Sequence, residues 1–123
     1  MLLSDEALIC YNIGIMRIRK NNDNLNEAEI ELIAKASDAL AHPARVEIFR
    51  YIYTQNMQRK LVCNKDLVAE FDYAQATISQ HIKKLLVSEL LAAEKKDNHS
   101  YYFVNLGMLA KYLDSVKKLN QLN

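Results

Sequence analysis

One stretch of the sequence, residues 74–86, constrains the fold and the function more than any other. When each residue advances a helix by about 100°, one face collects apolar side chains, namely Ile78, Ile82, Leu85 and Leu86. The opposite face collects small, amide and basic side chains, namely Ala76, Thr77, Gln80, Lys83 and Lys84. Amides near the start of a helix suit contacts with base edges, and lysines after them suit contacts with phosphates. The stretch therefore predicts a recognition helix, the helix that enters the major groove of DNA.

A shorter helical segment precedes this stretch. Residues 65–71 carry apolar side chains at helical spacing, namely Leu67, Val68 and Phe71. Only the link 71–73 separates the two segments, which is the length expected inside a helix-turn-helix. Asp72 is placed to cap the second helix. Residues 65–89 are therefore predicted to form a helix-turn-helix.

The segment that follows is typical of a β-hairpin. Residues 90–94 and 101–104 are short β-prone runs, and the polar connector 95–100 between them has the length of a hairpin loop. A basic hairpin directly after a helix-turn-helix indicates a wing, here residues 90–104. The predicted fold class is therefore mainly α with a small β-hairpin wing, a winged helix-turn-helix.

Three motifs in this order resemble those of the ArsR/SmtB family of bacterial winged-helix repressors. They are residues 39–48 (ALAHPARVEI), residues 76–82 (ATISQHI) and residues 100–104 (SYYFV). Family members often show serine where Ala74 and Ala76 stand. The resemblance covers the chain from about Asn26 onward and implies the element order α-α-α-α-α-β-β-α. It also implies a homodimer that binds double-stranded DNA, and a structural role for Arg45 in tying helices together.

Composition sets bounds that agree with this interpretation. A chain of 123 residues, half of them hydrophobic and a quarter charged, has the size and content of one globular domain. No run of about 18 apolar residues occurs, and the N-terminus turns acidic at Asp5, so neither a membrane span nor a secretory signal is expected. The predicted location is the cytoplasm. The net charge is only +1, but basic residues gather between Arg45 and Lys65, near the expected DNA side.

The remaining segments are predicted to be helices. Residues 1–20 carry a broad apolar arc and are expected to form an N-terminal dimerisation helix, and residues 105–120 a C-terminal one. Asn26 and Pro43 mark the starts of two helices between them. In the first of these two, the expected buried face is Ile30, Ile33, Ala34, Ser37 and Leu40. In the second, which is expected to run to about Thr54, it is Val46, Ile48, Phe49 and Ile52.

The predicted DNA contacts divide by chemistry. Gln80 and Thr77 are expected at base edges, and Ala76 against a thymine methyl group. Phosphate contacts are expected from polar and basic side chains of the recognition helix, namely Gln75, Ser79, Lys83 and Lys84. At the wing tip, Lys95, Lys96 and His99 are expected to reach the neighbouring backbone or the minor groove. The alternative for the lysines is an ordinary solvated face.

Histidine and cysteine are sparse. His81 is expected to be a packing residue and His42 a helix-start residue, so no metal site is predicted with them. Cys10 and Cys63 are the candidate thiols, since Cys63 lies where the ArsR/SmtB family's thiolate site looks like a C-x-C pair. Two thiols fall short of a closed zinc site. Inert reduced thiols are the simplest interpretation, and a redox response or the binding of a metal or metalloid effector are the alternatives.

The sequence contains no catalytic motif such as G-x-S-x-G, H-E-x-x-H or a phosphate-binding glycine loop, so an enzyme is not expected. Two hypotheses of function remain. The first is a sequence-specific DNA-binding transcription regulator, namely a homodimeric repressor, with or without a response through its thiols. The second is a winged-helix module that mediates protein contacts without DNA.

Overall fold

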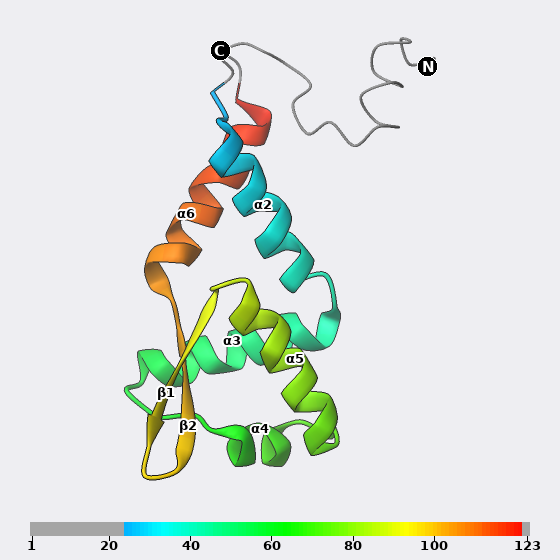
Figure 1. The fold of residues 1–123 in the computed structure, drawn as a ribbon, viewed down its shortest axis with the longest axis vertical. Coiled ribbons are helices and arrows are strands. Elements are labelled where there is room, and N and C mark those ends of the chain that lie inside the picture. Colours follow the sequence, from blue (N-terminus) through cyan, green and yellow to red (C-terminus); the bar gives the residue numbers. More distant parts are fainter. Residues whose placement is uncertain (1–23, 122–123) are drawn as a thin grey trace.

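The computed structural model describes residues 24–121 (Figure 1). Its elements follow in the order α2 (Glu27–Ala39), α3 (Pro43–Met57), α4 (Asn64–Glu70), α5 (Gln75–Val87), β1 (Leu91–Lys96), β2 (His99–Val104), α6 (Leu106–Lys117) and a short 3₁₀ helix η1 (Lys118–Asn120). Within these residues the order of helices and strands is the predicted one. The predicted N-terminal dimerisation helix, residues 1–20, lies outside the described residues.

The described chain has two parts that meet at α3. Helices α2 and α6 run side by side away from the rest, while α3, α4, α5 and the hairpin form the other part (Figure 1). The core fills this second part with fully buried side chains, namely Ile48, Ile52, Val62, Leu67, Ile78, Leu85 and Leu90. The helix-turn-helix and the wing therefore rest on one continuous apolar core.

The starts of α2 and α3 follow from local chemistry. The Asn26 side chain accepts a hydrogen bond from the Glu29 N–H at 2.8 Å, and the Glu29 carboxylate accepts one from the Asn26 N–H at 3.2 Å. This reciprocal pair is a capping box. His42 caps α3, since its Nδ1 accepts the Ala44 N–H at 3.1 Å. Pro43 occupies the first turn, where its missing N–H costs nothing.

Arg45 has the structural role that the family resemblance implied. Its Nε donates to the Ala39 carbonyl at 2.7 Å and its Nη2 to the Asp38 carbonyl at 3.3 Å. These carbonyls belong to the last turn of α2, where backbone acceptors begin to lack helical donors; the Asp38 carbonyl also accepts from the Ala41 N–H at 3.2 Å. The arginine thus fixes the corner between α2 and α3.

Two predicted buried faces were partly wrong. On α2 the buried residues are Ala36 and Ala39, whereas Ile30 is 43% exposed and Ala34 is exposed as well. On α3, Val46 is 46% exposed because the buried stripe runs through Ala44, Ile48 and Ile52 at four-residue intervals. A residue two positions from such a stripe points about 200° away from it.

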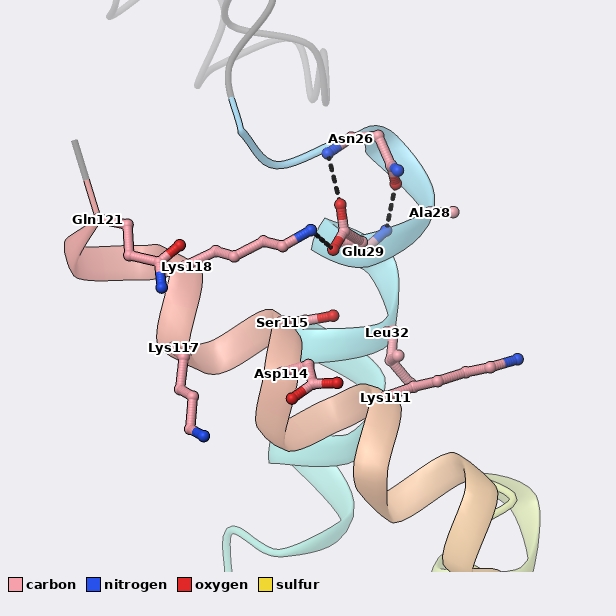
Figure 2. Close-up of a pocket in the computed structure, with 10 residues that line it drawn as sticks. All are labelled: Asn26, Ala28, Glu29, Leu32, Lys111, Asp114, Ser115, Lys117, Lys118 and Gln121. Carbon is pink, nitrogen blue, oxygen red and sulfur yellow. Dashed lines mark hydrogen bonds and ion pairs between the residues drawn. The ribbon is translucent and has the colours of Figure 1, made fainter. Parts of the chain in front are cut away.

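The C-terminal helix packs on α2 through polar contacts as well as apolar ones. Asn105 caps α6 by accepting the Met108 N–H at 3.1 Å, as predicted. The Ser37 and Tyr112 hydroxyls are 3.0 Å apart, and the Lys118 ammonium lies 2.6 Å from the Glu29 carboxylate. Figure 2 shows this ion pair at the edge of an open pocket between the two helices, on the far side of the molecule from the wing tip. None of the helices in the described range combines the length and apolar character needed to cross a bilayer.

Candidate nucleic-acid interface

The helix-turn-helix consists of α4, a short extended turn and α5. The Cys63 N–H at the start of α4 donates to the Asp66 carboxylate at 2.9 Å, which fixes the first turn of this short helix. Phe71 ends α4 in extended geometry, and Ala74 precedes α5 with φ −64° and ψ 151°. The prediction that Asp72 caps α5 was wrong. The N-cap is Ala74, two residues after Asp72, and its side chain has no acceptor for a capping hydrogen bond.

A row of rings supports this turn from α3. Tyr51 meets Phe71 edge-on at 5.7 Å between ring centroids, and Phe71 stacks on Tyr73 at 6.3 Å. Tyr73 in turn meets His81 of α5 edge-on at 6.2 Å. The first contact joins α3 to the turn, the second lies within the turn, and the third joins the turn to α5, so the rings form a continuous link from α3 to α5. Sequence reasoning missed this cluster, although the aromatic residues at positions 71 and 73 were its visible signal.

His81 also contacts His42, with ring centroids 4.8 Å apart. Burial lowers the pKa of His81, and the neighbouring His42 and Arg45 lower it further. His81 is half-buried and His42 is the α3 cap, so both have the packing roles that were predicted. The first turn of α3 and the middle of α5 are thereby in direct contact.

The outward face of α5 matches the predicted division of the helix. Its inward residues Ile78, Ile82 and Leu85 are buried. The side chains predicted to contact DNA are exposed at Gln75, Ala76, Ser79, Gln80, Lys83 and Lys84, while Thr77 is half-buried at the edge of the face. No ion pair joins Lys83 or Lys84 to another residue of the 24–121 range. Their ammonium groups can therefore turn toward external anions.

The strands of the wing are longer and its turn is tighter than predicted. Strands β1 and β2 pair antiparallel from Leu91 with Val104 to Lys96 with His99. Only Asp97 and Asn98 form the turn, with φ values of 52° and 65°. The expected six-residue connector was therefore wrong, because two residues in left-handed geometry close a hairpin directly.

This correction changes how the predicted wing residues lie. Lys95, Lys96 and His99 are all exposed, but they belong to strands and not to a loop. Successive residues of a strand point to opposite faces, so Lys95 and Lys96 cannot share one. Lys96 shares a face with its partner His99, and Lys95 with its partner Ser100. The two lysines would thus meet a DNA backbone from opposite sides of the wing.

Two asparagines that sequence reasoning missed anchor the wing. The Asn56 side chain accepts the Val104 N–H at 3.0 Å and donates to the Tyr102 carbonyl at 3.4 Å, which ties β2 to α3. The Asn64 carbonyl oxygen accepts the Tyr102 hydroxyl at 3.0 Å. The Tyr102 N–H also donates to the Val62 carbonyl at 2.9 Å. These partners lie about 40 residues or more apart in the sequence, so no local pattern announces them.

Of the two candidate thiols, Cys10 lies outside the described residues. Cys63 is half-buried at the start of α4 and is not in a disulfide. Within residues 24–121, no three side chains of His, Cys, Asp or Glu converge as a metal site would require.

Comparisons with known proteins fit this geometry. The sequence profile of the family "Bacterial regulatory protein, arsR family" matches residues 42–92, which run from the cap of α3 to the start of the wing. The arsenical resistance operon repressor of Bacillus subtilis is 34% identical over 84 residues, which are 66% of this chain and 76% of that repressor. This chain belongs to the arsR family of bacterial regulatory proteins.

A second relative gives the same result over a shorter span. The arsenical resistance operon repressor of Staphylococcus aureus is 31% identical over 62 residues, which cover 50% of this chain and 60% of that repressor. Membership of the arsR family confirms the expected class, a winged helix-turn-helix DNA-binding transcriptional regulator. Because the family is one of repressors, it also confirms that the chain is not an enzyme.

Solved structures confirm the fold of this arsR family member. An ArsR-like transcriptional regulator from Rhodococcus sp. RHA1 superposes with a TM-score of 0.65 at 17% identity, covering 75% of this chain and 82% of the other. A homodimeric winged helix-turn-helix DNA-binding domain from Mycobacterium bovis superposes with a TM-score of 0.58 at 16% identity, covering 80% and 89%. At these identities the likeness concerns the winged helix-turn-helix fold.

Proposed function

We propose that this arsR family member is a homodimeric repressor that binds a twofold-symmetric operator through α5 and the wing. The observation that carries the proposal is the division of α5 into a buried apolar face and an exposed face of amides and lysines. Two such helices in a dimer would enter successive major grooves about 34 Å apart. A regulator of this kind acts in the compartment that holds the chromosome, which is the cytoplasm of a bacterium.

The homodimer is supported by apolar residues that the described chain leaves uncovered on α6 and η1. Leu106 and Leu113 of α6 and Leu119 of η1 are each half exposed or more. Large exposed apolar patches on folded domains usually mark interfaces. The Mycobacterium bovis domain of the same fold is described as homodimeric.

In the proposed complex, Gln80 reads base edges and Lys83 and Lys84 neutralise phosphates. Lys95 and Lys96 hold the backbone on either side of the wing. An exposed glutamine can bond both edge atoms of an adenine, and such a contact provides about 1–3 kcal/mol of discrimination. Each lysine at a phosphate releases a condensed counterion, which makes affinity depend on salt.

The decisive experiment is selection of bound duplexes from a random or genomic library, followed by affinity measurements on the selected duplex. Gln80→Ala is expected to weaken binding about tenfold per half-site and to relax sequence preference there. Lys83→Ala is expected to lower the slope of log affinity against log salt by about 2 in a dimer, one phosphate per protomer. Lys111→Ala is the matched control, since Lys111 is an exposed lysine on α6. A flat salt response, or no selected duplex, would contradict the proposal.

The same selection tests the regulatory input. Binding is measured with the protein reduced, oxidised, or loaded with arsenite or zinc. A loss of affinity that Cys63→Ser abolishes would assign the response to the thiol at the start of α4. Equal binding in all four states would leave a repressor without a thiol input.

A further inference from the structure

A line of hydrogen bonds runs from the wing to the recognition helix through one residue of α4. The Tyr102 hydroxyl on β2 lies 3.0 Å from the Asn64 carbonyl oxygen, and the Asn64 amide nitrogen lies 3.4 Å from the Ser79 hydroxyl on α5. In Figure 1 the three segments gather at the same end of the molecule. Asn64 is the residue through which these two contacts pass.

The direction of each bond follows from the chemistry of the groups. The Asn64 carbonyl oxygen can only accept, so the Tyr102 hydroxyl is the donor. The Asn64 amide can only donate, so the Ser79 oxygen is the acceptor. The Ser79 O–H is then left to donate elsewhere. Ser79 is exposed on the face of α5 that is proposed to meet DNA, where phosphate oxygens are acceptors.

The tyrosine end of the line is held in place. Tyr102 is only 6% exposed, its N–H donates to the Val62 carbonyl, and its carbonyl accepts from Asn56. Burial raises the pKa of Tyr102, and the neighbouring Cys63 raises it further, so the phenol keeps its proton. A fixed donor at this end orients the Asn64 amide, which can otherwise rotate.

We propose that Asn64 is a positioning residue for DNA binding, because it orients the Ser79 hydroxyl as a donor to a phosphate and links that contact to the wing. This inference rests on the proposed function. The inference is supported by the alternation of donors and acceptors along this line of hydrogen bonds, because each bond polarises the next. Through this line a buried tyrosine of the wing, which cannot itself reach DNA, would influence a contact made by α5.

The experiment is a set of double-mutant cycles on a fluorescently labelled duplex chosen by library selection. Ser79→Ala is expected to weaken binding about tenfold or more per half-site, because a hydrogen bond to a charged phosphate is stronger than a neutral one. Asn64→Ala and Tyr102→Phe, which only affect the orientation of that hydroxyl, are each expected to weaken binding about three- to tenfold per half-site. In a Ser79→Ala background the other two changes should have almost no further effect, since all three act on one contact. The salt slope should stay unchanged in all three variants, because a neutral donor releases no counterion.

Two further variants keep the result interpretable. Asn64→Asp retains the shape of the side chain but presents only acceptors. The carboxylate should accept a hydrogen bond from the Ser79 hydroxyl, which could then no longer donate to a phosphate, and binding should weaken more than in Asn64→Ala. Asn98→Ala, at the wing turn and outside the line, is the control and should show no coupling to Ser79→Ala. Circular dichroism checks that each variant is folded, and Tyr102→Phe retains the ring that packs in the core.

The outcomes separate the two claims. If Asn64→Ala weakens binding as much with Ala at position 79 as with Ser, Asn64 contacts DNA directly and the relay is wrong. If Ser79→Ala binds like the wild type, the hydroxyl is not a phosphate donor and the relay is wrong as well. In both cases the wild type still binds the selected duplex, so the proposed function stands. A wild type that selects no duplex overturns the proposed function and the relay together.

Discussion

Helices α5 and α6 have the same amphipathic pattern, but the structure buries the apolar face of α5 and leaves that of α6 partly exposed. On α5 the apolar residues Ile78, Ile82 and Leu85 are all buried by the rest of the chain. On α6 the one fully buried residue is Ser115, while Leu106 is 52% exposed and Leu113 is 50% exposed. Within residues 24–121, the apolar face of α5 is covered and that of α6 is partly open.

The difference teaches that a helical apolar stripe predicts a contact but not its partner. For α5 the partners are α3, α4 and β1 of the same chain. For α6, helix α2 covers one side, and the leucines on the other side remain open. This division suits a protein whose DNA-facing part must be rigid in each protomer and whose other part joins two protomers.

The largest expected effect is on the free energy of unfolding, when a residue of the buried apolar face of α5 is truncated. Leu85→Ala should lower the free energy of unfolding by about 3 kcal/mol, because a fully buried leucine leaves a cavity when truncated. Urea denaturation at a fixed protomer concentration measures it. Val87→Ala on the same helix is the control, since Val87 is 64% exposed and should change stability by less than about 0.5 kcal/mol. Equal losses of stability in the two variants would contradict the claim that the buried face of α5 stabilises the protomer.

The exposed leucines of α6 should instead affect dimerisation. Leu113→Glu is expected to weaken dimerisation at least tenfold, about 1.4 kcal/mol, because a charge would be buried between two copies. Sedimentation equilibrium measures the dissociation constant. Lys111→Glu, an exposed position on the same helix, should leave dimerisation nearly unchanged. A Leu113→Glu dimer as tight as the wild type would place the interface elsewhere.

The same contrast explains how far the sequence could be read. Periodicity placed α5 within one residue and identified Ile78, Ile82 and Leu85, because their partners are in the same core. It failed at Ile30 of α2 and Val46 of α3, because an apolar residue can follow helical spacing and still face away from the described core.

Of the candidate site, the exposed face of α5 could be predicted, but the contacts that hold the wing could not. Asn56 and Asn64 bond Tyr102 and Val104 across 38 to 48 positions, and nothing in the local sequence distinguishes these two asparagines from other polar residues. The wing turn was misread for a local reason. Asp97 and Asn98 are a two-residue hairpin signal, which the polar residues around them obscured.

A smaller effect should appear on acidification, and it concerns the contact of α5 with α3. Because burial, His42 and Arg45 lower the pKa of His81 in the folded state, the unfolded chain binds a proton more readily. This contribution to stability is complete above the unfolded pKa of about 6.5 and is lost as the pH falls from there toward the lower folded value. His81→Gln should therefore show a smaller drop in urea midpoint between pH 7.5 and pH 5.5 than the wild type.

The matched variant for this test is His99→Gln, because His99 is exposed on β2 and away from α3. It should keep the pH response of the wild type. If His81→Gln loses as much stability as the wild type over this interval, the contact between the two helices does not resist protonation. The dissociation constant of the dimer should be the same for His81→Gln and the wild type, since His81 packs against α3 and the turn within one chain and lies away from α6.

The smallest effect is expected at the wing turn, at the far end from α6. Asn98 has a φ of 65°, a conformation that glycine adopts without strain, and a two-residue hairpin turn favours glycine at its second position. Asn98→Gly should raise the free energy of unfolding by about 0.5 kcal/mol. Ser100→Gly, at a paired strand position, should lower it by a similar amount, since glycine loses more freedom in a strand. Both changes should leave the dissociation constant of the dimer unchanged. A shift in that constant would show that the wing and α6 are coupled, which would contradict their separate roles in DNA binding and dimerisation.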